Sequence, residues 1–233
     1  VVHMSADARQ WKKDLLRQKG VEVQEYAGDY AAAVAAGRAA SRQDPMSYFV
    51  DDEHSKNLFL GYSVAASRLR LQLERQGVAV DGEHPLFVTI PCGVGGAPGG
   101  VTYGLKAAFG PFVHCFFAEP VQAPAMLAGL VSGLGEKISA GDLGLSGRTQ
   151  ADGLAVGRPS GLVCPLMETR VSGVVTPRDQ RLYDYLRLLY RTEGVFVEPS
   201  AAAGFAGPAA LASEEGRALL ARLGLEGKME QAA

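Results

Sequence analysis

The chain has 233 residues, of which 47% are hydrophobic and 21% are charged, a composition typical of a folded globular protein with a sizeable core. The net charge of −2 gives no electrostatic basis for binding nucleic acid or an anionic membrane. The cysteines Cys92, Cys115 and Cys164 are too widely spaced for a zinc site or a disulfide framework. No apolar run reaches membrane-spanning length and no signal peptide is visible, so we expect a cytoplasmic location.

The first fifty residues alternate between short strand patterns and helix patterns. Strands are expected over residues 1–4, 21–26 and 46–50. Between the last two strands, Asp29 can cap an alanine-rich helix that runs to about residue 41. Strands that alternate with helices predict a parallel sheet with right-handed crossovers.

A domain boundary is expected near residues 52–60, where this small unit ends and a long helix over 56–76 begins. We therefore assign residues 1–56 to part of a smaller α/β lobe and residues 57–233 to a larger lobe. A site between two lobes would suit an enzyme that closes on a small substrate.

The most informative segment is the glycine-rich run over residues 90–100. An apolar strand over 86–90 precedes it and a helix-forming stretch over 101–109 follows it. A strand, a glycine-rich turn and a helix in this order offer main-chain N–H groups to a phosphate, and the helix adds about half a positive charge at its N-terminus. The alternative is a tight connection without a ligand. Rossmann and P-loop patterns fit worse, because neither their glycine spacing nor a following Gly-Lys-Ser/Thr is present.

The pattern continues after the glycine-rich run. Further elements are expected as a strand over 113–118, a short helix over 124–131, a loop over 132–160, a helix starting at 176, a strand over 195–197 and a last helix over 208–223. Three positions in this part could carry chemistry. Glu119 follows a strand at the end where parallel sheets bind ligands, and Glu198 repeats that arrangement beside Ser200. The run over 151–157 could place its backbone against a flat ligand. For Glu119, Glu198 and this run, the alternative is a purely structural role.

Eight segments carry a resemblance that extends over nearly the whole chain. They are residues 3–8, 11–13, 49–53, 58–63, 91–100, 114–120, 151–157 and 198–200. In this order they resemble the bacterial D-serine dehydratase (D-serine ammonia-lyase) family, which has the tryptophan synthase β-like fold. The resemblance implies an α/β, two-lobed parallel-sheet fold of this type, present here in incomplete form, and pyridoxal 5′-phosphate as the cofactor.

The resemblance also implies a set of cofactor-binding residues. Main-chain groups of Val94, Gly95, Gly96 and Ala97 would hold the cofactor phosphate, in a loop shaped by Gly93 and Gly99; Gly153 would lie beside the ring, and Glu198 near the ring edge. Glu119 matches a position that binds a cation in related enzymes. Their divalent sites have a second acid six residues later, where this chain has Ala125, so a monovalent cation held mainly by carbonyl groups is expected instead.

No catalytic residue is assigned within the chain. In the family, the Schiff-base lysine precedes the strand with which this chain begins, and the partner of the pyridine nitrogen follows residue 233. Lys106 is the lysine nearest the glycine-rich loop, but it matches no catalytic position and is assigned to the helix surface. We therefore expect a portion of a longer protein that is inactive by itself.

The resemblance predicts the reaction of the whole protein. It is the deamination of D-serine by α,β-elimination, in which the β-hydroxyl leaves as water and hydrolysis of the resulting aminoacrylate takes up water again, so that the net products are pyruvate and ammonia. The protein would be a monomer that binds neither nucleic acid nor membrane. Two alternatives remain open. One is an L-serine or threonine dehydratase or a serine racemase of the same fold, and the other is a non-catalytic chain that binds phosphate or a partner.

Overall fold

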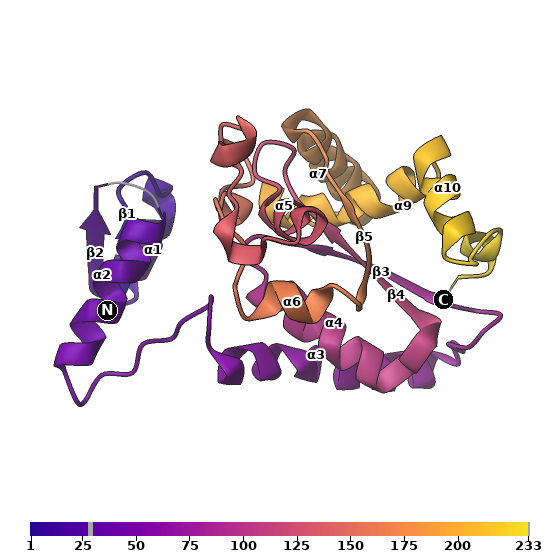
Figure 1. The fold of residues 1–233 in the computed structure, drawn as a ribbon, viewed down its shortest axis with the longest axis horizontal. Helices are drawn as coiled ribbons and strands as arrows, with labels where there is room; N and C mark the ends of the chain where they lie inside the picture. Colours follow the sequence, from indigo (N-terminus) through magenta and orange to yellow (C-terminus); the bar gives the residue numbers. More distant parts are fainter. Residues whose placement is uncertain (28–29, 233) are drawn as a thin grey trace. The chain divides into compact units, whose positions relative to one another are not determined.

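The computed structural model describes residues 1–27 and 30–232 (Figure 1). They form two compact units, Val1–Asp51 and Asp52–Ala233. Asp29, the expected cap of the alanine-rich helix, and Ala233 lie outside the described residues. No helix in the described part of the chain is long and apolar enough to cross a membrane.

The first unit contains a two-stranded parallel sheet. Its elements are β1 (Val2–Ser5), α1 (Gln10–Gln18), β2 (Val23–Tyr26) and α2 (Tyr30–Gln43). The third strand expected over residues 46–50 is not formed, because the apolar pattern there finds no strand to pair with. Met46 and Tyr48 instead lie 92% and 69% exposed.

A buried charge holds the first unit together. Lys13 of α1 is buried, and its Nζ donates hydrogen bonds to the Ala6 carbonyl at 2.7 Å and to the Glu25 carboxylate at 2.6 Å. Arg17 donates to the other oxygen of Glu25, and these two partners lower the pKa of Glu25. A buried ammonium is tolerated because both partners replace the water that it loses.

The second unit is built on three parallel strands. Its strands are β3 (Leu86–Pro91), β4 (Val113–Ala118) and β5 (Val171–Val175). Its α-helices are α3 (Lys56–Gln76), α4 (Gly96–Phe109), α5 (Ala125–Ser132), α6 (Val163–Met167), α7 (Asp179–Glu193), α8 (Pro199–Ala202), α9 (Ala206–Leu211) and α10 (Glu214–Arg222). Its 3₁₀ turns are η1 (Gly110–Phe112), η2 (Gly135–Lys137), η3 (Gly141–Leu143), η4 (Asp152–Leu154), η5 (Ala203–Phe205) and η6 (Lys228–Gln231).

The sheet order is β3-β4-β5, with the almost fully buried β4 in the centre. Helices α3 and α4 lie on one side of the sheet, and α7 and α9 lie on the other (Figure 1). Pairing of Leu86 with Val113 and of Pro91 with Ala118 brings the carboxyl ends of the strands to one edge. The predicted parallel α/β arrangement is therefore confirmed, and the segments that follow β3 and β4 emerge side by side.

Two strand assignments differ from the sequence pattern. Strand β5 is not among the elements expected from the sequence, yet it pairs with β4. The strand expected over residues 195–197 is not formed within the described chain, and Phe196 is 81% exposed. Strand formation requires a neighbouring strand, which local sequence does not reveal.

Some glycines of α4 are explained by packing against α3. A Cβ atom at Gly100 would overlap the Phe59 carbonyl, and one at Gly104 would overlap the Ser63 carbonyl. The two helices can approach this closely only where α4 has no side chain. Gly100 therefore serves a helix contact and not a ligand, although it belongs to the glycine-rich run.

Candidate functional site

The glycine-rich loop follows β3 and presents unpaired main-chain donors. The Cys92 N–H still bonds to the Ala118 carbonyl at 2.9 Å, after which the chain turns away from the sheet. Gly95 has a φ of +112°, which side chains disfavour, and its carbonyl accepts the first helical bond of α4 from Gly99. Within the described chain, the N–H groups of Gly95, Gly96 and Ala97 have no hydrogen-bond acceptor.

These donors fit an anion. Gly95 and Gly96 are buried, and a buried N–H without a partner is costly. The donors also stand at the start of the 14-residue helix α4, where the partial positive charge of the helix is located. A phosphate group would accept hydrogen bonds from these N–H groups, and its negative charge would be attracted to the partial positive charge of the helix.

A second backbone segment lies against this loop. A Cβ atom at Gly93 would come within 3.2 Å of the Gly153 carbonyl in η4. The Gly153 N–H in turn donates to Ser200 Oγ at 3.1 Å, and a Cβ atom at Gly153 would lie 3.7 Å from Glu198 Oε1. The structure thus brings together Gly93, Gly153 and Glu198, which are distant in sequence, and adds the buried Ser200 as the direct partner of Gly153.

Glu119 lies just beyond β4 and is fully buried. Its Oε1 and Oε2 accept hydrogen bonds from the N–H groups of Met126 and Leu127, each at 2.8 Å. Burial raises the pKa of Glu119 to about 8, although the two hydrogen bonds oppose that shift. Through its two hydrogen bonds the carboxyl group of Glu119 holds the first turn of α5, and the Met126 side chain reaches the loop at Gly95.

Comparison with known proteins now identifies the family. A family model described as pyridoxal-phosphate dependent enzyme matches residues 1–220. The chain belongs to this family. The predicted family and cofactor class are thereby confirmed.

Two curated relatives come from bacteria. The chain is 60% identical over 215 residues to a probable D-serine dehydratase of Fusobacterium nucleatum, covering 92% of the chain and 49% of that protein. It is 58% identical over 232 residues to a probable D-serine dehydratase of Bacillus subtilis, covering 99% of the chain and 51% of that protein. The chain spans about half the length of the curated relatives it matches.

Solved structures show the same fold. A threonine deaminase from T.th. is 25% identical with a TM-score of 0.67, covering 88% of this chain and 62% of that one. Diaminopropionate ammonia lyase from Escherichia coli is 21% identical with a TM-score of 0.75, covering 97% of this chain and 58% of that one. The second likeness is one of fold alone.

The residues present fit the cofactor of the family. The three unpaired N–H groups of the loop can donate hydrogen bonds to its phosphate. Gly93 and Gly153 have no side chains, so the two segments meet through their backbones alone. Lys106 is remote from this group, since it lies ten residues after Gly96, about 15 Å along α4. Its Nζ donates to the Val113 carbonyl at 2.5 Å, and the residue is partly exposed.

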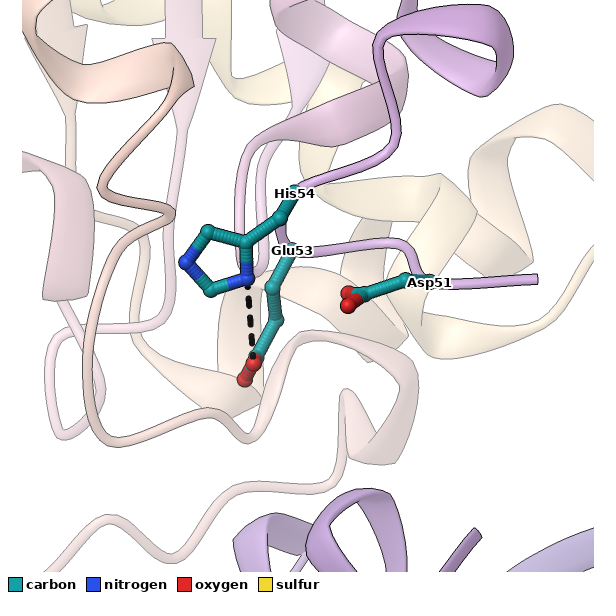
Figure 2. A group of neighbouring side chains, drawn as sticks. All are labelled: Asp51, Glu53 and His54. Carbon is teal, nitrogen blue, oxygen red and sulfur yellow. Dashed lines mark ion pairs between the residues drawn. The ribbon is translucent and has the colours of Figure 1, made fainter. Parts of the chain in front are cut away.

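The cysteines are buried, whereas His54 makes polar contacts near the start of α3. Cys92, Cys115 and Cys164 are buried and free, and burial raises the pKa of each thiol. His54 lies in the segment that leads into α3 (Figure 2). Its Nδ1 is 3.8 Å from Glu53 Oε2 and its Nε2 is 3.7 Å from Glu136 Oε2, so the imidazole links that segment to η2.

Proposed function

We propose that the whole protein containing this chain is a pyridoxal-phosphate-dependent D-serine dehydratase, which converts D-serine into pyruvate and ammonia. The observation that carries the proposal is the group of unpaired N–H donors in the loop whose Gly93 lies against Gly153, which in turn lies near Glu198. The identity of 55–60% to curated probable D-serine dehydratases supports the choice of substrate.

In this proposal the chain supplies the cofactor-binding part of the site. Val94, Gly95, Gly96 and Ala97 bind the phosphate through main-chain groups, with the loop shaped by Gly93 and Gly99. Gly153 lies beside the ring and Glu198 near its edge. When bound, the cofactor stabilises the negative charge that develops at the α-carbon of the amino acid.

We further propose that the lysine that binds the cofactor is not among the residues of this chain. The engagement of Lys106 with the Val113 carbonyl supports this assignment, because it keeps that ammonium at the other end of α4 from the loop. The chain by itself is then expected to bind the phosphate group without turnover, whereas the whole protein acts as a cytoplasmic monomer.

We also propose a division of the chain into parts of two lobes. Residues 1–56 would form part of the smaller lobe and residues 57–233 the larger, cofactor-binding lobe. For Glu119 we propose a monovalent cation, held mainly by carbonyl groups, that would balance the buried carboxylate. The depth of that burial supports the proposal, because an ionised carboxylate away from water gains most from a nearby positive charge.

The substrate is tested by comparing D-serine, L-serine and L-threonine. The whole protein loaded with pyridoxal phosphate is assayed for pyruvate and for the keto acid from threonine, and the 233-residue chain is assayed in parallel. Preferential use of D-serine by the whole protein is expected. Faster turnover of an L-amino acid would favour the alternative dehydratases and racemases, and turnover by the isolated chain would contradict the assignment of the lysine.

The loop assignment is tested by placing an acid at Ala97. As the second residue of α4, an aspartate there interacts favourably with the helix N-terminus but repels a phosphate. Ala97→Asp should therefore weaken binding of pyridoxine 5′-phosphate at least tenfold without lowering the melting temperature, as measured by calorimetry.

Gln180→Asp provides the matched control for this test. It introduces the same charge at the second residue of α7, where Gln180 is exposed, and should leave ligand binding unchanged. Equal binding by the Ala97→Asp variant and the unmodified protein would contradict the proposed phosphate site.

A further inference from the structure

Ser160, in the segment that precedes α6, is bonded to both the glycine-rich loop and the entrance to α3. It is 1% exposed. Its N–H donates to the Val94 carbonyl at 2.7 Å. Its Oγ donates to the Glu53 carbonyl and accepts the Val163 N–H at 3.1 Å.

The bond to Val94 controls the direction of a loop donor. A peptide unit is planar and trans, so the Val94 carbonyl and the Gly95 N–H belong to one rigid group and point in opposite directions. Holding the carbonyl against Ser160 therefore turns the Gly95 N–H away from the α6 segment. That N–H is one of the donors without an acceptor in the described chain.

The hydroxyl of Ser160 fixes the position from which its N–H acts. The hydrogen bonds of Oγ connect Ser160 to the Glu53 carbonyl before α3 and to the Val163 N–H at the start of α6. Val163 also packs behind the loop, since its Cγ1 lies 3.5 Å from the position of a Cβ atom at Gly95. Without the hydroxyl, the Ser160 N–H and the Val94 carbonyl are free to shift together.

We propose that Ser160 is a positioning residue for phosphate recognition, which orients the Val94–Gly95 peptide so that the Gly95 N–H points at the phosphate. The inference rests on the proposed function, because it assigns the loop to the cofactor phosphate. It predicts a specific loss of affinity for the phosphate group, whereas a serine that only stabilises the fold would affect all ligands equally.

The test compares two ligands that differ only in the phosphate. Pyridoxine 5′-phosphate and pyridoxine have no aldehyde, so neither reacts with lysines, and their affinities for the whole protein are measured by calorimetry. Ser160→Ala should weaken binding of pyridoxine 5′-phosphate at least fivefold and leave binding of pyridoxine within twofold of the unmodified protein.

Ser213 provides the matched control. It is also a serine before a short helix, and its Oγ accepts the Gly216 N–H at 3.1 Å and donates to the Ala210 carbonyl at 2.8 Å. Ser213→Ala removes a similar set of bonds before α10 and should change neither affinity. If Ser160→Ala does not fold, Ser160→Cys keeps the side-chain volume, weakens the hydrogen bonds and should show the same selective loss.

Each outcome decides the inference. An equal loss for both ligands, or no loss in either Ser160 variant, would overturn the role of Ser160 while leaving the proposed function intact. Absence of pyridoxine 5′-phosphate binding by the unmodified protein would contradict the proposed function and this inference together.

Discussion

At the scale of single residues, the most consequential group is the buried carboxyl of Glu119. Its ordinary pKa is 4.5, and burial raises it to about 8 in the folded protein. Between these values the folded state holds a proton that the unfolded state has released, so the free energy of unfolding falls as the pH rises. The slope from this group approaches about 1.4 kcal/mol per pH unit.

Glu119→Gln removes this titration and should flatten the pH dependence. Urea unfolding of both proteins is measured between pH 5 and 8 in tetramethylammonium buffer, whose cation is large. Identical slopes would contradict the raised pKa. If a small monovalent cation binds the ionised carboxylate, adding K⁺ should stabilise the unmodified protein more at pH 8 than at pH 5, and should not do so in the variant.

At the scale of elements, the contact between α3 and α4 depends on glycine for steric reasons. Alanine is favoured over glycine in a helix by about 1 kcal/mol, so an exposed helical glycine is improved by the change. At Gly100 the added methyl group overlaps the backbone of Phe59, which cannot move away as a flexible side chain would. A glycine-to-alanine substitution can therefore raise the free energy of unfolding at an exposed helical position and lower it at a close helix contact.

Gly100→Ala should lower the free energy of unfolding by about 2 kcal/mol or more, since helices that cannot approach lose packing. Gly61→Ala in α3 is the comparison, because that glycine is exposed and nothing lies within 4 Å of its Cβ position. It should raise stability by about 0.5–1 kcal/mol. Urea unfolding measures both, and a stabilising Gly100→Ala would contradict the described packing.

At the scale of the whole molecule, the chain consists of two compact units with a boundary between Asp51 and Asp52. The segment before the boundary has no helix or strand over residues 46–50, and its Tyr48 is 69% exposed. Such segments are the usual sites of proteolytic cleavage in a folded protein.

Limited digestion with chymotrypsin is done on a Phe196→Ser variant, because Phe196 is 81% exposed in a second segment without helix or strand, and it should cut first after Tyr48. Mass spectrometry is expected to find a persistent fragment that contains the second unit, and Tyr48→Ser should suppress this cleavage. Tyr190 is the internal comparison, because it is 61% exposed but lies within α7, which should protect it. Earlier cleavage after Tyr190 would argue against the stability of α7 in the second unit.

The sequence by itself predicted the local features of this protein. It placed the strand, the glycine-rich turn and the helix around residues 86–109, because apolar runs and glycines act over a few residues. Through its motifs it also identified the family and Glu119, Gly153 and Glu198 as positions of interest. It did not separate Gly100, which serves helix packing, from Gly95, whose φ requires glycine.

The tertiary structure decided every feature that depends on a distant partner. Strand β5 forms against β4, whereas residues 46–50 and 195–197 form no strand, since strand pairing joins segments far apart in the chain. The bond between Ser160 and Val94 crosses 66 positions, and that between Ser200 and Gly153 crosses 47. Local sequence patterns carry no information about such contacts, because packing and hydrogen bonding depend on proximity in space.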